Sequence, residues 1–250
     1  MHPQLFGGVA VTGETLDIFR RTFSRLPVIW ISMVVIATGA NLVDLVYGTG
    51  AGRAFSMLQV ASIIIRFFGV FWLGAAVLRT FVGSPPEPLQ IDRGIGFFLG
   101  WQIALLLVQA LVNFALWPVE TKMEPWLAAI AEPQLVVLVC IGLATSAVDL
   151  ISLRIIPWVV GQTALTPSAT VGAAWRGMRG QWRGAAKAYV ALVFPLFVVH
   201  YGLTAWLSHA AISRSLRLGG TIFDGIESVF LLMMLLSLYL ACTARAKPAA

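Results

Sequence analysis

The feature that most constrains this chain is a series of apolar runs, each long enough to cross a bilayer as a helix. We place six such runs at Leu26–Val46, Phe55–Leu78, Ile95–Trp117, Gln134–Ile156, Ala188–Leu207 and Thr221–Cys242. A helix rises about 1.5 Å per residue, so about 20 apolar residues cover the hydrocarbon core of a membrane. The sequence therefore predicts an all-α fold, a polytopic membrane bundle of six transmembrane helices.

Composition excludes a water-soluble domain. Of the 250 residues, 59% are hydrophobic and only 11% are charged, and the mean hydropathy is +0.87. Soluble domains carry about 25% charged residues. A membrane barrel requires apolar and polar residues to alternate along each strand, whereas runs such as Ile103–Val108 are apolar throughout. The connections are short, so we predict one integral membrane domain over residues 1–250.

A strongly basic segment, TPSATVGAAWRGMRGQWRGAAKAY at Thr166–Tyr189, lies between the fourth and fifth runs. We expect a single helix that begins at Thr166, with Pro167 at its first position. A helix with clustered cations beside large aromatic side chains suits the cytoplasmic headgroup layer of a membrane. Its glycines weaken helix propensity, so we expect the helix to form in contact with lipid or a partner.

Spacing within this segment predicts which side chains contact lipid. At about 100° per residue, Arg176, Arg179, Arg183 and Lys187 share one side of the helix, and the tryptophans lie on a neighbouring side. The predicted contacts with anionic lipid are Arg176, Arg179, Arg183, Lys187, Trp175 and Trp182.

The distribution of cations predicts the orientation of the bundle, because cytoplasmic loops are enriched in Lys and Arg. A second basic amphipathic helix, Gly13–Leu26, leads into the first run. One side of the predicted bundle collects Arg20, Arg21, Arg25, Arg79, Arg93, Arg154, Arg176, Arg179, Arg183, Lys187, Arg245 and Lys247, and the other side has Arg53, Lys122, Arg214 and Arg217. We therefore expect both termini in the cytoplasm. Because the cations flank apolar runs, the net charge of +6 indicates lipid contact and topology, and we expect no nucleic-acid partner.

The two basic segments, ETLDIFRRTFSRLPVIW and TPSATVGAAWRGMRGQWRGAAKAYVAL, resemble those of a group of bacterial inner-membrane proteins. This group comprises the membrane domain of glycerophosphodiester phosphodiesterases and related uncharacterised six-span proteins. In it, a basic elbow leads from one span into the next. The resemblance implies a helical module in the bacterial inner membrane. The soluble phosphodiesterase barrel with its metal ligands has no counterpart here, so the resemblance implies no enzyme activity.

Ionisable residues inside apolar runs are the best candidates for a functional site, since each costs a few kcal/mol to insert. Arg66 and Asp149 lie deepest in their runs, and Glu227 lies near the outer end of the sixth. We predict that Arg66 pairs with Asp149 or Glu227, either to hold an anion on a polar path or to join helices structurally. His200 has no second histidine at metal-ligand spacing, so we expect no metal site and no cofactor.

Two functions remain open. The first is a non-enzymatic accessory or scaffold subunit of a larger membrane assembly, indicated by short loops, large apolar faces and the absence of a catalytic motif such as HExxH or a P-loop. The alternative is a small transporter or lipid-handling protein, in which Arg66 and the basic segment bind anionic headgroups. The expected partners are anionic membrane lipids and other membrane subunits.

Overall fold

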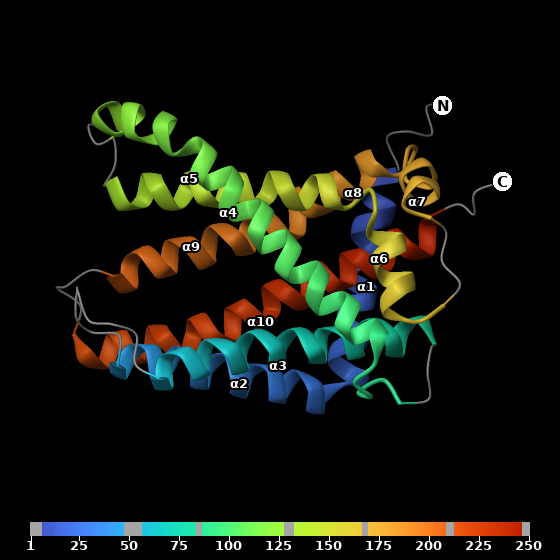
Figure 1. The fold of residues 1–250 in the computed structure, drawn as a ribbon, viewed down its shortest axis with the longest axis horizontal. Helices are drawn as coiled ribbons and strands as arrows, with labels where there is room; N and C mark the ends of the chain where they lie inside the picture. Colours follow the sequence, from blue (N-terminus) through green and yellow to red (C-terminus); the bar gives the residue numbers. More distant parts are fainter. Residues whose placement is uncertain are drawn as a thin grey trace.

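The computed structural model describes residues 7–47, 57–83, 87–127, 133–166, 170–208 and 213–246, and these residues form an all-α fold (Figure 1). The helices are α1 Gly7–Arg25, α2 Pro27–Tyr47, α3 Met57–Val82, α4 Arg93–Leu127, α5 Pro133–Ser152, α6 Ile156–Thr163, α7 Val171–Gly177, α8 Trp182–Ala188, the π-helix η1 Tyr189–Val193, α9 Phe194–Ser208 and α10 Arg214–Arg245.

The predicted membrane bundle agrees with these helices. Within the described residues, five helical segments are long and apolar enough to cross a membrane, and a sixth is counted if a bent pair forms one span. The first predicted run matches α2, and α10 contains the sixth. The predicted start of the second run, Phe55, lies outside the described residues, and α3 begins at Met57.

Prolines shape the bundle differently from the expectation at two places. The fourth run is broken, because the segments Ile141–Ser152 and Ile156–Thr163 meet at 75°. Pro157 is the second residue of α6, and a proline ring clashes with the carbonyl four residues earlier, which prevents α5 from continuing. By contrast, α4 runs beyond Trp117, the predicted end of the third run, and includes Pro118 and Pro125.

The basic segment is not the single helix that we expected from its sequence. It forms two short helices, α7 and α8, separated by a turn. The first begins at Val171, where the Thr170 hydroxyl accepts a hydrogen bond from the Ala173 N–H as an N-cap; Pro167 lies outside the described residues. Gly177 ends α7 and Gly180 lies in the turn, so the glycines that weaken helix propensity are where the helix breaks.

The helix α10 is the centre of the bundle. In the most apolar 18-residue stretch of α10, 67% of the residues are buried, compared with 11–33% in the corresponding stretches of the other four spans. Met233, Leu236 and Leu238 are fully buried. Figure 1 shows α2 and α3 beside α10, with α4, α5 and α9 across from them. Burying so much apolar side chain against neighbouring helices makes α10 the element on which the others pack.

Arg79 locks one end of α3. Its side chain is fully buried, its Nε donates to the Thr163 carbonyl at 2.8 Å and its Nη1 to the Gln90 carbonyl at 3.0 Å, and it forms an ion pair with Asp92. Burial acts to raise the pKa of Asp92, but hydrogen bonds from Arg79 and from backbone N–H groups hold that pKa below its ordinary value. Arg79 therefore joins α3, the α3–α4 connection and α6, and does not face lipid.

Both ends of the described chain lie at the same end of the bundle. There, α1 runs across the ends of the spanning helices and packs beside α8 and α10 (Figure 1). Arg245, the last residue of α10, forms an ion pair with Glu14 of α1. We call this end, with α1, α7 and α8, the basic end, because Arg20, Arg21 and Arg25 are exposed on α1 and the four predicted lipid-contact cations are exposed nearby.

Close packing of α10 on α2 predicts the effect of a small substitution. A Cβ at Gly225 would lie 2.5 Å from the Thr38 hydroxyl and 2.7 Å from the Thr38 Cα, so Gly225→Ala forces two backbones apart. We expect a loss of about 2 kcal/mol in the free energy of unfolding, measured by thermal unfolding in detergent.

The control lies on the same helix. Gly219 has open space around its Cα, so Gly219→Ala gains helix propensity without a clash, a stabilisation of up to about 1 kcal/mol. Equal stabilities for the two variants would contradict the close contact at Gly225.

Candidate functional site

The spanning helices enclose a chain of polar contacts that links four of them. Arg66 of α3 donates through Nη1 to the Asn41 Oδ1 of α2 at 2.6 Å. Asn41 in turn donates through Nδ2 to Asp224 Oδ2 of α10 at 2.8 Å. Asp224 Oδ1 lies 3.2 Å from His200 Nδ1 of α9, and Glu227 Oε2 lies 3.0 Å from the same nitrogen. We call these five residues the polar network.

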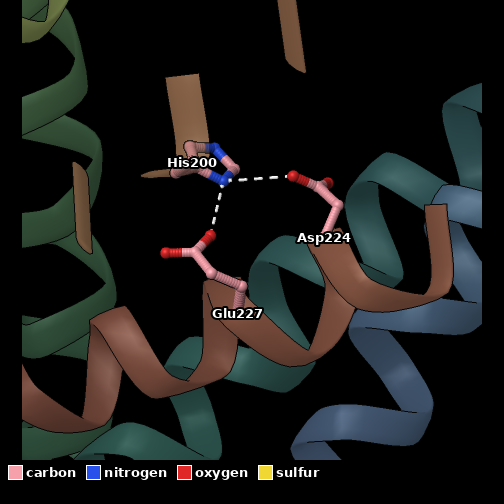
Figure 2. Close-up of side chains that lie close together, drawn as sticks. All are labelled: His200, Asp224 and Glu227. Atoms are coloured by element: carbon pink, nitrogen blue, oxygen red, sulfur yellow. Dashed lines mark hydrogen bonds and ion pairs between the residues drawn. The ribbon is translucent and has the colours of Figure 1, made fainter. Parts of the chain in front are cut away.

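Local helix geometry brings the network together. Asp224 and Glu227 are three residues apart on α10, so their side chains share one face of the helix. Gly225 lies between them and allows the backbone of α2 to approach within van der Waals contact at Thr38, three residues from Asn41. Figure 2 shows the two carboxylates reaching from α10 toward the ring of His200.

The network lies inside the spans and becomes more exposed toward α3. Asn41 is about 9 Å from the end of α2, and Asp224 is about 15 Å from the start of α10, at about 1.5 Å per residue. Glu227 is 5% exposed and Asn41 8%, whereas the Arg66 side chain is exposed. The network thus carries two carboxylates in the interior and one permanent cation at its outer edge.

Asp149 belongs to a second, separate cluster. Its carboxylate accepts a hydrogen bond from the Tyr189 hydroxyl at 3.1 Å and one from Gln109 Nε2 at 3.4 Å. Asp149 is 4% exposed and Tyr189 is fully buried. Tyr189 is the first residue of the π-helix η1. Pro195 follows η1 and has no N–H to donate to the carbonyl one turn earlier, and the wider π-helical turn accommodates this missing hydrogen bond. The structure thus joins Asp149 to α4 and η1.

The contacts of Arg66 in the structure therefore differ from the predicted pairing with Asp149 or Glu227. Arg66 bonds an amide, Asn41, and reaches Glu227 only through Asp224 and His200. Sequence reasoning weighed ionisable residues one by one and passed over Asn41, which is uncharged. The spacing of Asp224 and Glu227 on one helix face, together with a histidine in the adjoining span, was the available signal for the network.

The predicted lipid-contact residues lie together at the basic end. Arg176 on α7, Arg179 in the turn, and Arg183 and Lys187 on α8 are all exposed, although they do not share one helix. The guanidinium of Arg154 lies 4.6 Å from the ring of Trp175 and 5.3 Å from that of Trp182, contacts typical of cation–π pairs.

Trp182 is anchored as well. Its indole N–H donates to the Leu150 carbonyl at 2.9 Å, which ties α8 to the end of α5. The two tryptophans and Arg154 therefore hold α7 and α8 against the spans. The four cations of the basic segment are exposed to the surroundings.

The chain was compared with known protein families, curated proteins and solved structures. No protein-family model, curated protein or solved structure matches this chain. The fold is that of a multi-pass α-helical membrane protein, and the polar network and the basic end are its two candidate sites.

The bridging role of Asn41 predicts energetic coupling between two substitutions. Asn41→Leu and Arg66→Met each break the same hydrogen bond, so the double variant should lose less stability than the two single losses combined. A coupling energy of about 1–2 kcal/mol is expected for a hydrogen bond to a charged group, measured by thermal unfolding in nanodiscs.

A control pair separates this coupling from general damage. Gln109 belongs to the Asp149 cluster, so combining Gln109→Leu with Asn41→Leu should give additive losses. Additive losses for Asn41→Leu with Arg66→Met as well would refute the bridge.

Proposed function

We propose that this chain is a non-enzymatic, lipid-handling membrane protein that binds anionic headgroups at its basic end. The observation that carries the proposal is the exposure of four cations, Arg176, Arg179, Arg183 and Lys187, on two short helices and the turn that joins them, beside a pair of tryptophans. Cations recognise lipid phosphates electrostatically, and tryptophan favours the interface between headgroups and acyl chains.

The arrangement of α1 supports the same proposal. This helix runs across the ends of the spans (Figure 1), as an interfacial amphipathic helix does. Arg20, Arg21 and Arg25 are exposed along it, and Val11 and Thr15 are buried against the bundle. Cations on α1 thus add to those of α7, α8 and the turn between them at the same end of the bundle, which suits binding of anionic headgroups.

We further propose that the basic end faces the cytoplasm of a bacterial cell and that the spans cross its inner membrane. The positive-inside bias supports this orientation. Both basic segments support the proposed kinship with six-span inner-membrane proteins related to the membrane domain of glycerophosphodiester phosphodiesterases.

Headgroup binding predicts a charge-dependent loss of affinity. We expect Arg183→Ala to weaken binding of dioctanoyl phosphatidylglycerol about fivefold, the effect of about one interfacial cation. Arg179→Ala combined with Arg183→Ala should weaken it by more than tenfold. Native mass spectrometry of the detergent-solubilised protein, titrated with the lipid, measures the affinities.

Arg214 provides a matched control, since it is also exposed in the first turn of its helix but lies at the opposite end of the bundle. Arg214→Ala should leave the affinity unchanged, and dioctanoyl phosphatidylcholine should not distinguish any of the variants. Equal losses for Arg183→Ala and Arg214→Ala would reject a specific headgroup site.

A second candidate function, an accessory subunit of a membrane assembly, is favoured by the surface around Arg66. This charged side chain is exposed on α3. Its neighbours along the helix, Ile63, Ile65 and Phe68, are also exposed. A cation on an apolar face at this depth is costly against lipid tails, and a polar group of a partner subunit would remove that cost.

Native mass spectrometry of the protein extracted gently from its own membranes distinguishes the two functions. Foreign subunits in fixed stoichiometry that Arg66→Ala releases would establish the accessory function. Loss of bound anionic lipid from Arg179→Ala/Arg183→Ala, in particles that contain only this chain, would establish lipid handling.

A further inference from the structure

Three side chains of the polar network meet in a geometry that metal ions use. His200 Nδ1, an oxygen of Asp224 and an oxygen of Glu227 all lie within 4.8 Å of one another, and Figure 2 shows the three side chains converging. Nδ1 lies 3.2 Å from Asp224 Oδ1 and 3.0 Å from Glu227 Oε2. Ligands about 2.1 Å from a tetrahedral zinc ion are separated by about 3.4 Å, so a small adjustment would admit an ion.

Glu227 provides an independent observation that points to a ligand. Its side chain is 5% exposed, and while Oε2 contacts His200, Oε1 has no hydrogen-bond partner in the part of the chain that the structure describes. A buried carboxylate oxygen without a partner is costly. An ion bound by Glu227 would place a positive charge beside this buried carboxylate and lower that cost.

The charge of the network favours an added cation. With His200 neutral, as metal ligation requires, two carboxylates, Asp224 and Glu227, are opposed by the single charge of Arg66, which reaches them through Asn41. An excess of negative charge inside a span is costly, and a bound cation would relieve it. The donor set of one imidazole and two carboxylates suits divalent first-row metals such as Zn²⁺, Co²⁺ and Mn²⁺.

The surroundings also orient and open the site. Asn41 Nδ2 holds Asp224 Oδ2 at 2.8 Å, which fixes the carboxylate with its other oxygen toward His200, as outer hydrogen bonds do around metal ligands. The side chains of His200 and Asp224 are 27% and 16% exposed, so the ligands are not sealed inside the bundle.

We propose that His200, Asp224 and Glu227 bind one divalent transition-metal ion between α9 and α10, with Asn41 as a positioning residue. Three protein ligands leave a fourth coordination position open for water or another ligand. This site is distinct from the basic end and does not depend on the function proposed for it.

Direct metal binding tests the proposal. The protein, purified with a tag that contains no histidine and stripped with a chelator, is titrated with Zn²⁺ by calorimetry and with Co²⁺ by visible absorption. We expect one ion per chain with micromolar or tighter affinity, and Co²⁺ bands typical of four-coordinate geometry. Absence of saturable binding to the wild-type chain would overturn the proposal, and would leave a proton on His200 as the cation of the network.

Isosteric variants locate the ion. Glu227→Gln and Asp224→Asn keep the shape of each side chain and remove its charge, and each should abolish the one-to-one binding. Asp44→Asn changes a carboxylate outside the cluster, which accepts a hydrogen bond from Ser62, and should leave the affinity unchanged. Retained affinity in Glu227→Gln would assign the ion to another site and refute the proposal.

Asn41→Leu tests the positioning role separately. Loss of an outer hydrogen bond should weaken Co²⁺ binding about 10- to 100-fold while the absorption bands persist, because the three ligands remain. A purely structural Asn41 would change the unfolding temperature and leave the affinity as in the wild type.

Discussion

The absence of water inside a bilayer is the constraint on which the rest of this structure depends. A buried polar group is stabilised by a partner within the bundle, and several of the side chains described above have one. Arg79 is fully buried and bonds two carbonyls and Asp92. Asp149 is held by a tyrosine and a glutamine. Asn41 joins a guanidinium to a carboxylate. These contacts tie helices that apolar packing alone would leave free to slide or rotate, since lipid tails are as apolar as the helix faces.

The apolar runs were sufficient to predict the membrane fold, because the length and hydrophobicity of a span are properties of the sequence alone. Contacts between spans were not predictable in the same way. Helices that are apolar all round carry little information about which face meets which neighbour. Arg66 could therefore be recognised as a candidate, while its bond to Asn41 depends on how α2 and α3 are rotated. The break between α7 and α8 was hidden for a different reason: the cations continue at helical spacing through Gly177 and Gly180, whose low propensity ends the helix.

The two candidate sites divide the molecule along its length. The basic end gathers exposed cations on α1, α7 and α8, which is the basis of the lipid-phosphate binding that we propose. The polar network lies nearer the opposite end and holds two carboxylates, of which Glu227 is 5% and Asp224 16% exposed. The helix α10 connects the two sites, because it contributes Asp224 and Glu227 to the polar network and Arg245 to the basic end.

The π-helix η1 gives this connection an unusual property. A π-helical turn contains one residue more than an α-helical turn fits, so the helix that follows is turned relative to the helix that precedes it. Tyr189 faces Asp149 from within η1, and His200 faces α10 from the α9 helix beyond it. The extra residue therefore rotates the second half of this span relative to the first. Tyr189 in the first half can then face one cluster while His200 in the second half faces the other, an arrangement that a regular helix over the same sequence would not give.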